Sequence, residues 1–140
     1  MTLASAITLL FVLFFFIIAW FGLSYILSPR MENPDAIARL TGNCGDTMEI
    51  ALQMSDGKVM KTHYWTDGCT MSRTCIEFAA RLASGKSLKE LRNINMTHII
   101  DDIGPVPESH LHCAQLAETV LQKALSDYMA GHEDKPATQG

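Results

Sequence analysis

The chain has 140 residues, which suffices for one domain of ordinary size and one additional segment. Its formal net charge is −4, from 11 basic and 15 acidic residues, so it lacks the basic surplus of a nucleic-acid-binding domain. Every charged side chain follows Leu27, and the N-terminal segment inflates the hydrophobic content of 48%. We therefore expect an apolar segment, then an ordinary soluble domain with no nucleic-acid partner.

The segment from Leu3 to Leu27 has no charged residue and predicts a transmembrane helix. As a helix it would be about 37 Å long, enough to cross a hydrocarbon core of about 30 Å with some tilt. Trp20 and Tyr25 stand toward its C-terminal end, where aromatic rings favour the membrane interface. A cleaved signal peptide is the alternative. It fits less well because no basic residue precedes the apolar run and no small-x-small cleavage site follows.

Flanking charges predict the orientation of this helix. Arg30 and Arg39 follow the apolar segment, whereas only the α-amino group precedes it. The positive-inside rule then predicts a single-pass protein of the cell membrane with a cytoplasmic soluble domain. In that compartment the four cysteines should be free thiols, although a secreted domain could form two disulfides.

The predicted soluble domain covers residues 31–131 and belongs to the α+β class, with a small antiparallel sheet (a hairpin core) covered by several helices. Asn33 followed by Pro34 is typical of a helix start, so we expect a short helix at Pro34–Leu40. Residues 132–140 are polar and predict a disordered tail.

A β-hairpin is predicted next. Apolar residues alternate from Met48 to Met54, which is the period of a strand. Asp56 and Gly57 form a strong turn signal, and residues 59–66 form the return strand. One face of that strand would carry Met60, Thr62 and Tyr64.

Helices are predicted for the remainder, with a loop at residues 104–107. Three longer segments are expected at 70–84, 97–102 and 111–130, the last ending at Gly131. A further short helix begins with a capping box at residues 87–90. The first carries an apolar stripe of Ile76, Ala79, Ala80 and Ala83. The last carries a stripe of Ala117, Val120, Leu121, Ala124 and Tyr128.

Three cysteines stand at positions typical of ligands. Cys44 lies in a glycine-flanked loop before the hairpin, while Cys69 and Cys113 each open a predicted helix. An antiparallel hairpin brings the start of its first strand beside the end of its second, so Cys44 and Cys69 should meet at one end of the sheet. A helix N-terminus lowers the pKa of a thiol, which favours the thiolate at Cys69 and Cys113.

Two other residues could complete this site. Asp46 would share a face with Cys44 if the segment were extended, and His112 is adjacent to Cys113. Three thiolates with a carboxylate or an imidazole fit tetrahedral zinc or an iron–sulfur cluster. Cys75, six residues beyond Cys69, falls on a different face of the helix and is assigned to packing. His63 and His98 are assigned to the surface.

In their order and spacing these motifs resemble the IscU/NifU N-terminal type of iron–sulfur cluster assembly scaffold, across essentially the whole predicted soluble domain. The matching segments are Glu32-Asn33-Pro34, Cys44-Gly45-Asp46, Gly68-Cys69, Ser84-Gly85-Lys86-Ser87-Leu88, His112-Cys113-Ala114-Gln115-Leu116-Ala117 and Ala124-Leu125-Ser126-Asp127-Tyr128.

The resemblance implies that Cys44, Asp46, Cys69 and Cys113 bind a transient [2Fe-2S] cluster, or zinc, with His112 as an alternative metal ligand. It implies that Asp46 keeps the cluster labile, and that a cysteine desulfurase delivers sulfur as a persulfide to Cys113. The cluster would then pass to apo iron–sulfur acceptor proteins. Such a scaffold is not an enzyme in the turnover sense.

The chain departs from the family pattern at the N-terminal anchor, at the added thiol of Cys75, and at the chaperone-recognition segment. That segment corresponds to residues 106–110, where His110 replaces the basic residue, which argues against chaperone docking. The main alternative function is a zinc-containing sulfur acceptor, a persulfide carrier for a cysteine desulfurase. A structural zinc module at the membrane and a disulfide-stapled domain beyond the bilayer are further alternatives. The interval from Cys69 to Cys113 lacks the insertion of SufU-type acceptors, which favours the IscU-like branch.

Overall fold

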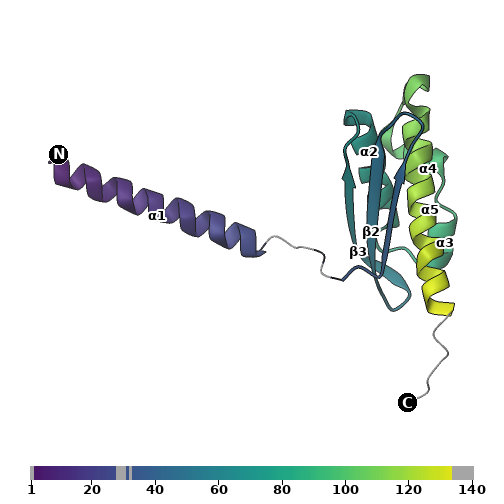
Figure 1. Ribbon diagram of the computed structural model, residues 1–140, viewed down its shortest axis with the longest axis horizontal. Coiled ribbons are helices and arrows are strands. Elements are labelled where there is room, and N and C mark those ends of the chain that lie inside the picture. The colour runs from purple at the N-terminus through teal and green to yellow at the C-terminus, as the bar shows by residue number, and fades with distance from the viewer. Residues whose placement is uncertain (1, 28–30, 32, 134–140) are drawn as a thin grey trace, which may run out of the picture. The chain divides into compact units, whose positions relative to one another are not determined.

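The computed structural model describes residues 2–27, 31 and 33–133, which divide between two compact units, residues 1–30 and 31–140 (Figure 1). The first unit contains helix α1, Leu3–Leu27, with the bounds expected for the apolar segment. By length and composition alone α1 could cross a membrane, with a mean hydropathy of 2.7. Arg30, used above to predict the orientation, lies outside the described residues.

The second unit contains a three-stranded antiparallel sheet in the order β1-β2-β3. Its strands are β1 (Ala36–Thr41), β2 (Thr47–Ser55) and β3 (Lys58–Thr66). The prediction of a short helix at Pro34–Leu40 is wrong, because residues 36–41 form β1, which pairs with β2. Asn33 has a φ of 58°, not the extended conformation of an N-cap. The inward residues of β1 also have the two-residue period of a strand: Ala36, Ala38 and Leu40.

The predicted hairpin is confirmed, with one difference in β3. Asp56 and Gly57 both have positive φ, 53° and 73°, as a two-residue hairpin turn requires. The strand register shifts between Gln53 and Met54, leaving Met60 without a cross-strand partner. Met60 is therefore 61% exposed and does not share the inner face with Thr62 and Tyr64, because a bulge reverses the alternation.

The helices of the second unit are α2 (Thr70–Ala83), α3 (Leu88–Arg92), α4 (Met96–Ile103), the 3₁₀ turn η1 (Glu108–His110) and α5 (Leu111–Glu133). The capping box at Ser87 and Glu90 is confirmed. The predicted end of the last helix is wrong, because Gly131 does not adopt the left-handed conformation that ends a helix. The first two residues of the predicted tail are thus helical, and residues 134–140 lie outside the described part of the chain.

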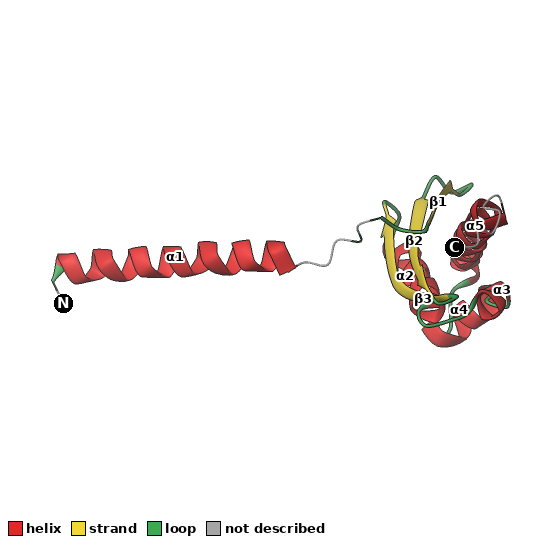
Figure 2. Cartoon of the chain, turned by 90° about the horizontal axis from the view of Figure 1, so that it is seen from below, coloured by secondary structure: helices red, strands yellow, loops and turns green. Residues whose placement is uncertain are grey.

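One hydrophobic core lies between the sheet and the helices. Helix α5 packs on β1 and β2, and α2 packs on β3 and on α5, all on one face of the sheet (Figure 2). The predicted stripes are buried except at Tyr128, which is half-buried. The buried residues are Ile76, Ala79, Ala80 and Ala83 in α2, and Ala117, Val120, Leu121 and Ala124 in α5. The alanines in both stripes let the helices approach the sheet and each other closely.

Candidate metal centre

Three chain segments meet at one end of this sheet. The loop between β1 and β2 lies there beside the end of β3, since Met48 pairs with Thr66. The start of α2 follows directly, and a hydrogen bond of 2.7 Å from the backbone N–H of Thr47 to the Asp67 side chain (Oδ1) ties this junction to β2. Antiparallel pairing and this hydrogen bond therefore bring together segments that are far apart in sequence.

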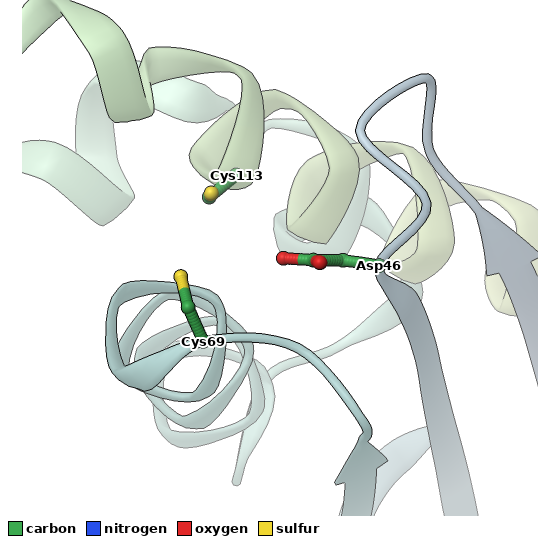
Figure 3. Close-up of side chains that lie close together, drawn as sticks. All are labelled: Asp46, Cys69 and Cys113. Atoms are coloured by element: carbon green, nitrogen blue, oxygen red, sulfur yellow. The ribbon is translucent and has the colours of Figure 1, made fainter.

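Asp46, Cys69 and Cys113 converge at this point (Figure 3). Their candidate ligand atoms, one carboxylate oxygen and two Sγ atoms, all lie within 4.8 Å of one another. Cys69 is exposed, Asp46 is half-buried and Cys113 is 1% exposed. Two soft sulfur donors and one hard oxygen donor around one point suit zinc or iron.

Cys44 does not join this group within the part of the chain that the structure describes. The expectation that Asp46 shares an extended face with Cys44 is wrong, because residues 42–46 form a turn. Gly45 N donates to Gly42 O at 3.0 Å, and Gly45 has a φ of 90°. The thiol of Cys44 is exposed on this turn.

Cys44 and His112 both line a cavity of about 450 Å³ on this side of the domain. The remaining lining residues are Gly42, Asn43, Gln115, Leu116 and Thr119. The His112 ring stacks on that of His110, with centroids 6.4 Å apart. Of the five predicted site residues, three therefore meet directly, while Cys44 and His112 share the cavity.

The environments of the thiols differ in ways that the sequence pattern did not predict. Cys69 is the N-cap of α2, and its hydrogen bonds with the side chain and then the backbone of Ser72 are the main causes of its lowered pKa. Burial raises the pKa of the Cys113 thiol, and repulsion from Cys69, Cys44 and Asp46 raises it further, against a lowering by Ser72. The lowered pKa expected for Cys113 is thus wrong, because desolvation outweighs the helix end.

The fourth cysteine is part of the core. Cys75 is 0% exposed, and burial raises its pKa to about 11. Its position agrees with the packing role predicted from its helical spacing. His63 and His98 are exposed, as expected, and His98 also completes a capping box with Asn95.

Ser72 is a site residue that the sequence reasoning missed. Its side chain is 0% exposed and contacts Asp46, Cys69 and Cys113. It lies three residues after Cys69, a spacing that places two side chains on one face of a helix. That spacing could have identified Ser72 as a neighbour of Cys69. The contact between Ser72 and Asp46 could not be predicted in this way, because the two residues are 26 positions apart in the sequence.

We expect alkylation of the thiols in two groups. Iodoacetamide at neutral pH should modify Cys44 and Cys69 first, because both are exposed and Cys69 has a lowered pKa. Cys75 and Cys113 should react only after denaturation, because both are buried. Peptide mass mapping of the full-length chain in detergent measures the order. Early modification of Cys113 in the folded chain would contradict the described burial.

A family comparison identifies the domain. The model of the NifU-like N terminal domain matches residues 31–135. The chain belongs to this family. The resemblance inferred from the motifs is thereby confirmed, and the α+β class is confirmed by the observed sheet and helices.

Relatives of this NifU-like chain include proteins named as iron–sulfur cluster assembly scaffolds. It is 29% identical over 101 residues to the iron-sulfur cluster assembly scaffold protein IscU 1 of Archaeoglobus fulgidus, across 71% of this chain and 65% of that protein. It is 30% identical over 93 residues to the iron-sulfur cluster assembly scaffold protein IscU of Escherichia coli strain K12, across 66% of this chain and 72% of that protein. The match thus spans slightly less than two thirds of the archaeal relative.

A solved structure shares the fold. The crystal structure of a hypothetical protein matches 70% of this chain and 85% of its own with a TM-score of 0.54, at 18% sequence identity. This likeness concerns the arrangement of the sheet and helices alone.

Proposed function

We propose that this NifU-like chain is a membrane-anchored scaffold for iron–sulfur cluster assembly. Iron and sulfide are its cargo, which it assembles into a transient [2Fe-2S] cluster and passes to apo acceptor proteins. The observation that carries the proposal is the convergence of Asp46, Cys69 and Cys113 within 4.8 Å, in a domain of this family. The role that we propose for the site is to hold the cluster and release it.

The three thiols and the carboxylate contribute differently to the proposed function. Cys69 and Cys113 supply sulfur ligands, which iron–sulfur clusters prefer. Cys44 supplies the third thiolate from a glycine-flanked turn beside the same end of the sheet, and its repulsion acts on Cys113. Asp46 supplies an oxygen ligand, which binds iron of a cluster less tightly than a thiolate and so favours release.

Helix α1 supports the proposal of membrane attachment. It is 25 residues long, and none of its residues is buried within its own unit. In the second unit, β1 runs from Ala36 to Thr41 and leads toward the metal site, so the chain enters this domain at the end of the sheet opposite to the site. We propose that α1 anchors the chain in the cell membrane and that the second unit is cytoplasmic, with a cysteine desulfurase and acceptor proteins as its partners.

Anaerobic reconstitution tests the scaffold function. The full-length chain in detergent, incubated with iron and sulfide, should develop visible sulfur-to-iron charge-transfer bands. Cys44→Ser should lose most of this absorption, because one thiolate ligand is removed. Cys75→Ala is the matched control and should keep the bands, because Cys75 is a core residue. The intact mass of the purified chain also shows whether residues 1–27 are retained, as an anchor requires.

Two outcomes would contradict the proposal. A chain that never develops the bands, although it is folded, is not a scaffold. Equal bands in wild type and Cys44→Ser would remove Cys44 from the ligand set.

The second candidate function is a zinc-containing sulfur acceptor. The exposed Cys69 thiol with its lowered pKa favours it, since such a thiol is a ready nucleophile. Its thiolate would attack the terminal sulfur of a desulfurase persulfide, the donor S–S bond would break, and the donor cysteine would leave as a thiolate. The buried Cys113, expected from the family resemblance to accept sulfur, is less accessible to such a donor. Tight zinc with a persulfide on Cys69 by mass, and no cluster, would select this function.

A further inference from the structure

We propose that Ser72 is a positioning residue that holds the Asp46 carboxylate in the metal site and controls how cargo engages it. The inference rests on the metal-binding role proposed above and extends it to a residue outside the ligand set. Ser72 lies in the first turn of α2, and its hydroxyl donates a hydrogen bond to Asp46 Oδ2. The Asp46 carboxylate is thus held opposite the two thiols by a residue of α2 in addition to its own loop.

Ser72 is the one buried polar side chain in the described part of the chain. A buried hydroxyl costs free energy unless it has hydrogen-bond partners. Ser72 Oγ lies 3.3 Å from Cys113 Sγ and 3.5 Å from Cys69 Sγ, in addition to its bond with Asp46. The three partners of Ser72 are therefore the three residues of the metal-binding group.

A hydroxyl has one proton, so these three partners compete for it. A carboxylate oxygen is a stronger acceptor than a thiol sulfur, so the proton lies on the bond to Asp46 Oδ2. Asp46 can then bind a metal ion through its other oxygen, Oδ1, while the Ser72 hydroxyl keeps its bond to Oδ2. The hydroxyl therefore orients the carboxylate both before and after metal binding, and no buried polar group is left unsatisfied.

The packing around Ser72 confines the carboxylate to this position. A Cβ atom at Gly68 would lie 2.6 Å from Asp46 Oδ2 and 2.7 Å from Ser72 Cβ. The space between the end of β3 and the start of α2 is therefore filled by the carboxylate and the serine. Asp46 is held by a hydrogen bond on one side and by the Gly68 backbone on the other.

The test is a double-mutant cycle of metal affinity in the full-length chain in detergent. Co²⁺ is the probe, because its charge-transfer and ligand-field bands report the thiolate ligands and the coordination geometry. Ser72→Ala should weaken Co²⁺ binding about tenfold, the size typical of losing a group that orients a ligand. In the Asp46→Ala background, the same substitution should cost clearly less, no more than about threefold, since only the contacts of Ser72 with the two thiols are then lost.

Thr74→Ala is the matched control. It removes a hydroxyl from the same helix, one that donates to Thr70 O and does not contact the metal group. It should leave the Co²⁺ affinity and spectrum unchanged. Ser72→Thr, which keeps a hydroxyl, should bind Co²⁺ more tightly than Ser72→Ala, and a far-UV spectrum of each variant verifies folding.

An equal loss in both backgrounds would overturn the proposal, because Ser72 would then act through packing. Full affinity in Ser72→Ala would overturn it as well. If wild type binds Co²⁺ with the expected coupling but never assembles a cluster, the scaffold function fails and the role of Ser72 stands. A wild-type chain that binds no Co²⁺ would overturn both.

Discussion

Replacing Asp46 with alanine should lengthen the lifetime of an assembled iron–sulfur cluster about tenfold, equivalent to roughly 1.4 kcal/mol on the barrier to release. Asp46 is half-buried and is the oxygen donor among the three converging groups. A hard carboxylate exchanges with water or with an acceptor thiol more readily than a thiolate, so it provides the route by which iron leaves. The decay of visible absorption in the presence of a chelator measures the lifetime.

The equilibrium affinity for Co²⁺ and the rate of cluster release should respond differently to Asp46→Ala. Asp46→Ala removes a ligand and so weakens Co²⁺ binding, while the cluster, held by thiolates, leaves more slowly. Asp127→Ala is the matched control, since it also removes one negative charge but from an exposed pair with Lys123 on α5. A cluster lifetime in Asp46→Ala that is unchanged or shorter would exclude the proposed role of Asp46 in release.

Gly68→Ala should abolish most metal binding, with a loss of at least about tenfold, and should lower the thermal stability of the folded domain. The new Cβ would lie 2.6 Å from Asp46 Oδ2 and 2.7 Å from Ser72 Cβ, distances that real side chains do not tolerate. The carboxylate can swing away, but Ser72 Cβ is fixed to the helix, so the start of α2 must also shift. Overpacking of this kind costs about 1–3 kcal/mol.

Co²⁺ titration and a thermal melt of the full-length chain in detergent measure both effects. Gly131→Ala is the matched control, because nothing lies within 4 Å of its new Cβ and the residue is inside α5. The control should be neutral or slightly stabilising, since alanine favours a helix by about 1 kcal/mol over glycine. Wild-type metal affinity in Gly68→Ala would show that the carboxylate does not need its present position.

The helices and the central hairpin were predictable because their signals are local. The spacing of Ile76, Ala79, Ala80 and Ala83 indicates a buried helix face, and all four are buried. Asp56 and Gly57 predict the tight turn that the structure has. Strand β1 was mistaken for a helix because Asn33 and Pro34 imitate a helix start, while the strand forms by pairing with β2 further along the chain.

The candidate site was predictable in its residue types and less so in its geometry. The cysteines, Asp46 and His112 lie within residues 31–135, the range that the family model matches, and each stands in a short local motif. Which of them meet depends on one turn: the positive φ of Gly45 directs Asp46 toward Cys69 and Cys113 and leaves Cys44 beside the cavity. The pKa of Cys113 depends on burial by elements remote in sequence, so its position at a helix end does not by itself predict the direction of the pKa shift.

The amino-acid sequence alone therefore determined the apolar N-terminal helix, the α+β class and the thiols that serve as candidate ligands, because periodicity, turn chemistry and motif spacing act between near neighbours in the chain. Only the tertiary structure decided that Asp46, Cys69 and Cys113 form the group and that Ser72 joins them. Asp46 and Ser72 are 26 positions apart in the sequence, and Ser72 and Cys113 are 41 positions apart. The sheet register and the packing of α2 against α5 bring them together. Contacts of that range depend on how the whole core packs, and no local pattern encodes them.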